Sequence, residues 1–219
     1  MAMGGEDVSG GEFDIFKYYN DVIILSLLLL IGSALTAPWL EVSFRSYWDT
    51  LYYLALPLVL TVLLHEGGFH ALVAKLCGAD VGFGISAKYG MVTPYISFRT
   101  PLTVKKARYV IVAPILISIA AFLVSWLTRS PFWALLYIFN TAGMAGDFLI
   151  LLVLSKMPSE APPVWDEGTV MKSEIEFPEP YPSWVSKGLV LLLVLVILVI
   201  AANFRAEVEV VYVSNQTNP

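Results

Sequence analysis

Charged residues are scarce in this sequence. They make up 14% of the 219 residues, whereas 58% are hydrophobic, and the mean hydropathy is +0.74. A globular chain is on average about one quarter charged. Because the deficit lies in uncharged stretches of about 20 residues, we expect a lipid bilayer to be the main solvent of this chain. The same composition excludes intrinsic disorder and collagen-like repeats.

Cysteine, histidine and clustered basic charge are also lacking. Cys77 is the single cysteine, which excludes an internal disulfide framework and a zinc cluster built on thiolates. The formal net charge is -5 with 13 Lys and Arg residues, so the chain lacks the basic face that a nucleic-acid partner would require. The two histidines, His65 and His70, lie close together.

Five apolar stretches are long enough to cross a bilayer as helices. They lie at 22–40, 50–78, 109–128, 130–155 and within 184–204. The pattern predicts an all-α membrane protein with about five transmembrane helices, of which four form a core over 22–155. A cleaved signal peptide is a weaker interpretation of the first stretch, because the preceding segment is acidic where a signal peptide is basic.

The distribution of Lys and Arg predicts the orientation of these spans. With the N-terminus in the cytoplasm, ten cations face the cytoplasm and three face outward, which accounts for all 13. The positive-inside rule therefore favours a multi-pass integral membrane protein. Its N-terminal segment 1–21 would be cytoplasmic and its C-terminal tail 205–219 external.

Two segments between the spans differ in composition. Residues 79–104 are rich in Gly, β-branched and aromatic residues with partial alternation, which predicts a short cytoplasmic β-hairpin turning near Lys88, Tyr89 and Gly90. Residues 156–183 are acidic and rich in proline, which predicts an irregular cytoplasmic loop.

Apart from Lys75 at a helix end, four chargeable side chains of the types that hold or serve a metal lie inside the predicted spans: His65, Glu66, His70 and Asp147. Such groups are costly in a bilayer unless they are paired, neutral or bound to a metal. At about 1.5 Å per residue, His65 and Asp147 lie roughly 21 and 24 Å from the outer ends of their helices, so their depths match. Two His and one carboxylate form the ligand set of a catalytic zinc site, and Glu66 would remain free to deprotonate water.

The sequence resembles a family at this point. The stretch HEGGFHALVAKLCG, then RYVIVAPILI, NTAGMAGDFLILLVLSKMP and a later Asp-Glu-Gly are similar to zincin-type membrane peptidases grouped as a domain of unknown function. They are more distantly similar to the site-two protease class of intramembrane metalloproteases. The resemblance covers roughly residues 55 to 170. It implies a Zn²⁺ cofactor, with His65 and His70 as ligands, Glu66 as general base and Asp147 as third ligand.

The spacing of the histidines departs from that family. The family motif is His-Glu-x-x-His, whereas three residues separate Glu66 from His70 here. On a regular α-helix, side chains five residues apart lie about 140° apart and could not share one metal. A π-bulge would absorb the extra residue, and two consecutive glycines ease that distortion. The alternative is a degenerate site without competent zinc.

Three further residues are candidates for positioning a substrate. Asn140 would hydrogen-bond a substrate backbone or a ligand, or else join two helices. Pro94 and Tyr95 would lie at the hairpin, where an edge strand could pair with an extended substrate. Asp166, in the Asp-Glu-Gly segment, either belongs to a solvated loop or lies at the site, as the resemblance suggests.

The sequence favours an intramembrane zinc metalloprotease that hydrolyses peptide bonds of membrane-embedded or membrane-proximal substrates. Its partners would be a membrane protein substrate and the lipid bilayer. A catalytically inactive zincin-like scaffold or assembly subunit is the alternative. A transporter or proton relay is a weaker interpretation, because the chain has no internal repeat and no second set of buried charges.

Overall fold

The computed structural model describes residues 10–88 and 91–203. The strands are β1 (Gly11–Asp14), β2 (Val81–Lys88), β3 (Met91–Leu102), β4 (Val164–Asp166) and β5 (Val170–Ser173). The helices are the 3-10 helix η1 (Ile15–Tyr18), α1 (Tyr19–Leu35), α2 (Tyr47–Thr50), the π-helix η2 (Leu51–Ala55), α3 (Leu56–Val62), the π-helix η3 (Leu63–His70), α4 (Ala71–Leu76), α5 (Val104–Val112), α6 (Ile115–Thr128), α7 (Pro131–Gly143), α8 (Ala145–Lys156) and α9 (Trp184–Asn203).

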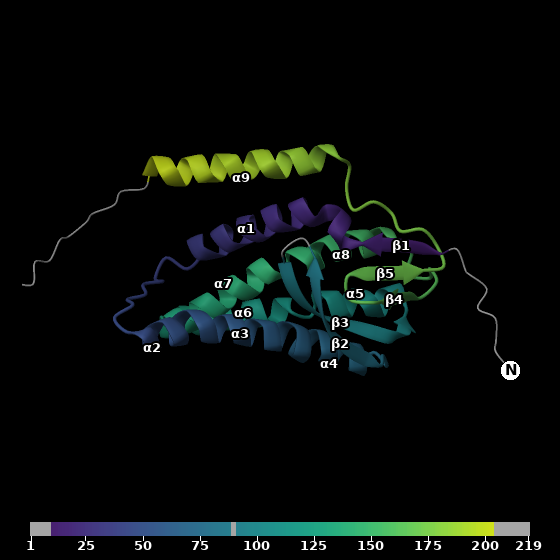
Figure 1. Cartoon of the computed structure of the whole chain (residues 1–219), viewed down its shortest axis with the longest axis horizontal. Coiled ribbons are helices and arrows are strands. Elements are labelled where there is room, and N and C mark those ends of the chain that lie inside the picture. The colour runs from purple at the N-terminus through teal and green to yellow at the C-terminus, as the bar shows by residue number, and fades with distance from the viewer. Residues whose placement is uncertain (1–9, 89–90, 204–219) are drawn as a thin grey trace, which may run out of the picture.

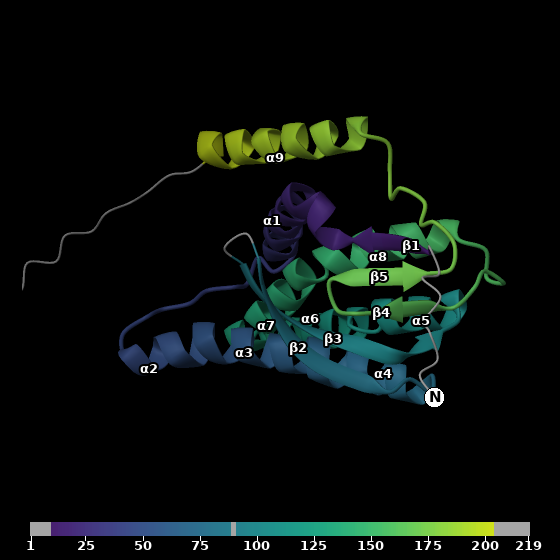
Figure 2. The ribbon, with the colours of Figure 1, turned by 45° about the vertical axis from the view of Figure 1, so that its right-hand side comes forward.

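The five strands form one antiparallel sheet in the order β1-β5-β4-β3-β2. The sheet lies at one end of the molecule beside α5 and α8, while α2 lies at the opposite end (Figure 2). The prediction of an all-α membrane protein is therefore wrong, because the chain has an α/β fold. The prediction included only a local hairpin between two helices. The sheet instead combines strands from three distant parts of the chain.

The predicted hairpin is confirmed, since β2 and β3 pair from Val81 with Phe98 to Lys88 with Met91. Its predicted turn includes residues 89 and 90, which lie outside the described part of the chain. The segment 156–183 is not the irregular loop that its prolines indicated. It contains β4 and β5, joined by a tight turn in which Glu167 N–H donates to Val170 O and Gly168 adopts a positive φ of 94°.

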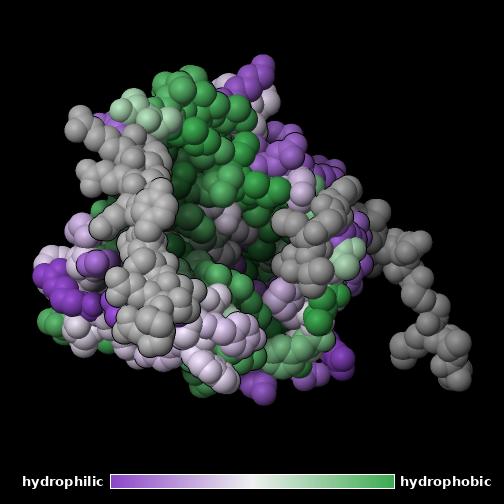
Figure 3. All heavy atoms as spheres, turned by 60° about the vertical axis from the view of Figure 1, so that its left-hand side comes forward, coloured by the Kyte–Doolittle hydropathy of each residue, from purple (hydrophilic) through white to green (hydrophobic). Residues whose placement is uncertain are grey.

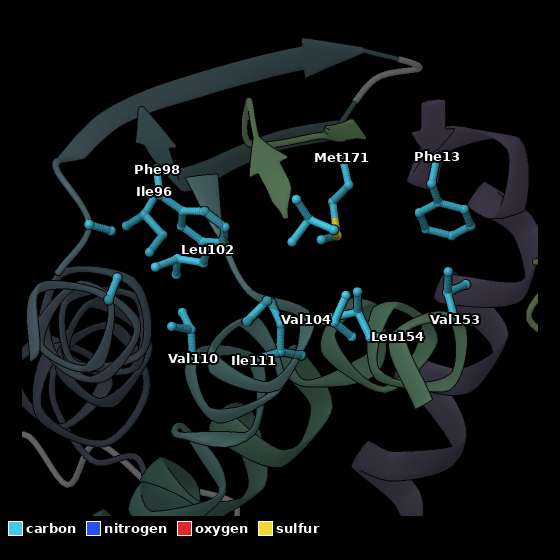
Figure 4. Close-up of a cluster of buried hydrophobic side chains, with 14 of the residues drawn as sticks. Phe13, Ile96, Phe98, Leu102, Val104, Val110, Ile111, Val153, Leu154 and Met171 are labelled. Carbon is cyan, nitrogen blue, oxygen red and sulfur yellow. The ribbon is translucent and has the colours of Figure 1, made fainter. Parts of the chain in front are cut away.

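The core lies between the sheet and the helices α4, α5 and α8. Phe98 and Leu102 of β3 and Met171 of β5 face Val110 of α5 and Leu154 of α8 across this layer (Figure 4). Phe13 of β1 joins the same cluster, which explains why the N-terminal segment adds to the sheet. Burial of large apolar side chains of this kind contributes roughly 1.5–3 kcal/mol each. The sheet is thereby held against the helices that carry the candidate site.

Several helices are long and apolar enough to cross a membrane. Within the described residues they are Ile15–Leu35, Tyr47–Leu76, Val104–Thr128 and Trp184–Asn203, and the bent pair α7 and α8 would make a fifth span. No residue of α9 is buried in the described structure, and α9 runs beside α1 on the outside of the molecule (Figure 1). Figure 3 shows a broad hydrophobic surface flanked by hydrophilic residues. The bounds of these helices agree with the predicted spans to within several residues.

Candidate metal centre

The helix that carries both histidines is wound as a π-helix over Leu63–His70. Ala71 N–H donates to Glu66 O, five residues earlier, which is the hydrogen bond of a π-turn. The expected bulge is thus confirmed, and it absorbs the extra residue between Glu66 and His70. The rings of His65 and His70 lie on the same side, with their centroids 4.8 Å apart.

Asp147 comes from a break between two helices. The predicted single span over 130–155 is divided at Met144 into α7 and α8, which meet at an angle of 44°. Asp147 therefore lies in the first turn of α8, where the partial positive charge of the helix N-terminus favours a carboxylate. The break directs Asp147 toward η3.

The three predicted ligands meet in the interior. Asp147 Oδ2 lies 3.0 Å from His65 Nε2, and Asp147 Oδ1 lies 3.2 Å from His70 Nε2. Both histidines are buried, at 5% and 4% exposure. The two helices thus bring these groups together, although His70 and Asp147 are 77 positions apart in the sequence.

The donor set has the properties of a cation site. His70 Nδ1 lies 2.8 Å from Val110 O, and because a carbonyl can only accept, Nδ1 carries the ring proton. His70 Nε2 therefore faces Asp147, and in the neutral ring it offers its lone pair to a metal. Two imidazole nitrogens thus lie within 3.0 and 3.2 Å of one carboxylate in the interior. This is the donor set of a catalytic zinc site, so these residues fit a bound Zn²⁺.

Glu66 lies next to this point. Ligand atoms of His65, Glu66 and His70 lie within 4.8 Å of one another. Glu66 and Ile96 of β3 line the same cavity, so the sheet lies against the site at this point. Glu66 is thus placed to exchange a proton with a molecule bound at the centre.

A cavity of about 180 Å³ opens beside the centre. Glu66, Asp147, Pro94 and Tyr95 line it, as does Asp166 of β4. Pro94 and Tyr95 thus lie at the site, on a stretch of β3 that precedes its pairing with β4. The ring of Tyr95 lies against Gly168, where a Cβ atom would come within 1.9 Å of the ring. The β4–β5 turn therefore requires a glycine to accommodate Tyr95.

Asp166 belongs to this site and not to a solvated loop. It is 7% exposed, and its Oδ1 accepts a hydrogen bond of 2.7 Å from Gly168 N–H. Burial raises the pKa of the Asp166 carboxyl group to about 7, against the opposing effect of that hydrogen bond. The Asp-Glu-Gly turn flanked by alternating apolar residues was the sequence signal for a hairpin that could have placed it.

We expect Asp166 to make stability depend on pH. Because its folded pKa of about 7 exceeds the ordinary 3.8, the folded state retains a proton that the unfolded chain releases. Stability should therefore fall as the pH rises from about 4 to about 7, by on the order of 4 kcal/mol, and then level off. Thermal-unfolding midpoints of zinc-depleted protein across this range should decline less for Asp166→Asn than for the wild type.

Glu160→Gln, which changes an exposed carboxylate, is the control and should keep the wild-type slope. Other groups near Asp166, namely His70, Glu66 and Asp147, are unchanged in both variants. Identical slopes for Asp166→Asn and the wild type would contradict the raised pKa.

Asn140 is also found at the centre, but away from the cavity. It is fully buried, and its Oδ1 lies 3.1 Å from His65 Nδ1. Its Nδ2 donates to Pro114 O and to Ser118 Oγ. The sequence did not indicate Ser118, because a single serine in an apolar span is common in membrane helices.

Comparisons with known proteins agree with this geometry. A family model described as "Putative zincin peptidase" matches residues 58–162. A protein of Pyrococcus woesei, described as "Uncharacterized 24.7 kDa protein in gap 5'region", is 57% identical over 210 residues, which cover 95% of this chain and 94% of that protein. No solved structure matches the chain significantly.

Proposed function

Because this chain belongs to the zincin peptidase family, we propose that it is a zinc metallopeptidase that hydrolyses peptide bonds of membrane-embedded or membrane-proximal substrates. The observation that carries the proposal is the meeting of His65, His70 and Asp147 at one buried point with Glu66 beside them. These residues come from two helices whose lengths and compositions suit membrane spans.

The ligands of the metal would be His65 Nε2, His70 Nε2 and the Asp147 carboxylate. When bound, zinc supplies a Lewis acid for the peptide carbonyl and lowers the pKa of a water molecule to about 7. Three protein ligands leave a fourth position for water or substrate, as in catalytic zinc sites. The cavity beside the centre gives a substrate access to that position.

Glu66 would act as general base and then as general acid. It accepts a proton from the attacking water and passes it to the amine that leaves when the C–N bond breaks. Below its pKa of about 7, Asp166 is uncharged and adds no further negative charge to the cavity.

The substrate would bind in an extended form. The carbonyls of a helix are engaged in intrahelical hydrogen bonds, so a membrane-spanning substrate must unwind before hydrolysis. Pro94 and Tyr95 line the cavity, where the described strands leave the β4 side of β3 unpaired before Phe98. An extended substrate segment would lie along this stretch of β3.

The membrane placement follows from the charges. A cytoplasmic N-terminus and an external C-terminus would put the sheet and the metal centre on the cytoplasmic side of a multi-pass protein. The distant similarity to the site-two protease class agrees with this arrangement. Reporter fusions at the two ends of the chain test the orientation.

The deciding experiment measures metal and cleavage together on the full chain in detergent. We expect about one zinc ion per chain by mass spectrometry of metals. A chelator should remove both the zinc and the cleavage of a labelled unfolded protein such as casein, and added Zn²⁺ should restore both. Protein without zinc after Zn²⁺ addition would instead support the zincin-like scaffold, which also predicts that His65→Ala leaves function intact.

A further inference from the structure

A buried polar cluster lies behind His65, on the side away from the cavity. It consists of Asn140 of α7, Ser118 of α6, Thr141 of α7 and the carbonyl of Pro114. Asn140 is 0% exposed, and Ser118 Oγ lies 2.9 Å from Thr141 Oγ1. None of these groups lines the cavity, and their hydrogen bonds join them to one another and to His65.

The hydrogen bonds of Asn140 determine the orientation of its amide. Asn140 Nδ2 lies 3.0 Å from Pro114 O, and a carbonyl oxygen can only accept, so this atom is the amide nitrogen. Its second proton is directed to Ser118 Oγ at 2.8 Å. The amide oxygen is therefore the atom that faces His65 Nδ1 at 3.1 Å.

An amide oxygen can only accept a hydrogen bond, so His65 Nδ1 must carry the ring proton. In the neutral ring, His65 Nε2 then presents a lone pair toward Asp147. In the opposite tautomer, Nε2–H would donate to Asp147 Oδ2 at 3.0 Å and occupy both groups. The hydrogen bond to Asn140 thus favours the tautomer in which His65 Nε2 can bind a metal. It disfavours the tautomer in which Nε2–H donates to Asp147 and blocks the site.

We propose that Asn140 is a positioning residue that holds His65 in the tautomer required for metal binding. This inference rests on the metal site of the proposed function. His70 is held in the same way by Val110 O, but that acceptor is a backbone atom and is not altered by substitution. Asn140 is therefore the side chain on which the state of the centre depends. The Oδ1 atom and both N–H groups of its side-chain amide make hydrogen bonds within the protein, so Asn140 does not contact the substrate.

The tautomer can be observed directly, because the chain has two histidines and a ¹⁵N-histidine spectrum contains only their signals. In the metal-free wild type at alkaline pH, we expect His65 to carry its proton on Nδ1. In Asn140→Leu, which is similar in size but lacks the acceptor, the proton should shift to Nε2. Zinc affinity, measured by competition with a chelator, should fall about 10- to 100-fold.

Thr141→Val is the matched control. It removes one partly buried hydrogen bond from the same cluster, at the adjacent position, without touching His65. We expect it to lower the thermal-unfolding midpoint but to keep the wild-type tautomer and zinc affinity. If Asn140→Leu does not fold, Asn140→Ala provides the same test, since it also removes the acceptor.

Two outcomes would overturn the inference. One is a wild-type tautomer with zinc affinity within about twofold of wild type in Asn140→Leu. The other is an equal loss of affinity in Thr141→Val, which would assign the effect to packing. A wild-type chain that binds no zinc would instead refute the proposed function, while the tautomer in the metal-free protein would still decide the role of Asn140.

Discussion

Glu66→Gln is expected to abolish peptide hydrolysis while zinc stays bound. Glutamine keeps the size of the side chain and an oxygen that can accept a hydrogen bond, but it cannot take a proton from water. Loss of a general base costs about 10²- to 10⁴-fold in rate. The metal ligands His65, His70 and Asp147 are untouched, so the metal content should remain that of the wild type.

The measurement compares cleavage rate and zinc content in the same preparations of the full chain. Glu174→Gln, a change of the same chemistry at an exposed position, is the control and should cleave at the wild-type rate. Undiminished cleavage by Glu66→Gln would remove Glu66 from the mechanism. Loss of zinc together with activity would make Glu66 a ligand and not a base.

Asp147→Asn should have the largest effect on metal binding. The free energy of zinc binding to a four-ligand site is typically about 10–16 kcal/mol. Divided equally, it gives each ligand roughly 3 kcal/mol, or about 100- to 1000-fold in affinity. The amide also brings N–H donors that would bond the imidazole lone pairs and close the site. Zinc should therefore no longer raise the thermal-unfolding midpoint, because a metal stabilises the folded protein only when it binds to it.

Asp166→Asn is the matched control for this experiment. It makes the same change in the same cavity, but no metal ligand is involved. We expect zinc to stabilise Asp166→Asn as it stabilises the wild type. A wild-type response to zinc in Asp147→Asn would show that Asp147 is not a ligand, and the third ligand would then have to be sought elsewhere.

The two predictions together separate the enzyme from the scaffold. An enzyme requires that Asp147→Asn lose zinc and activity while Glu66→Gln loses activity alone. A scaffold with a degenerate site would be indifferent to both substitutions. The π-helix bears on this choice, since it removes the objection that His65 and His70 would face different directions on a regular helix.

The metal centre could be predicted because its residues are conspicuous in an apolar chain. An ionisable group in a bilayer is costly, so His65, Glu66, His70 and Asp147 were recognisable by residue type alone. Helix geometry then gave their depths, and the two glycines indicated how the helix could absorb an extra residue. The tails at 1–9 and 204–219 lie outside the described residues, so the predicted external tail stays a prediction.

The apolar helices, the β2–β3 hairpin and the residues of the candidate centre could be predicted from the chain alone, because periodicity, residue type and spacing are local properties. The complete sheet could not, since β1, β4 and β5 are short strands whose pairing depends on contacts between distant segments. The positions of Asp166 at the cavity and of Asn140 beside His65 likewise depend on the tertiary structure. Whether a polar side chain lines a cavity or supports a histidine depends on what packs against it, which no local pattern encodes.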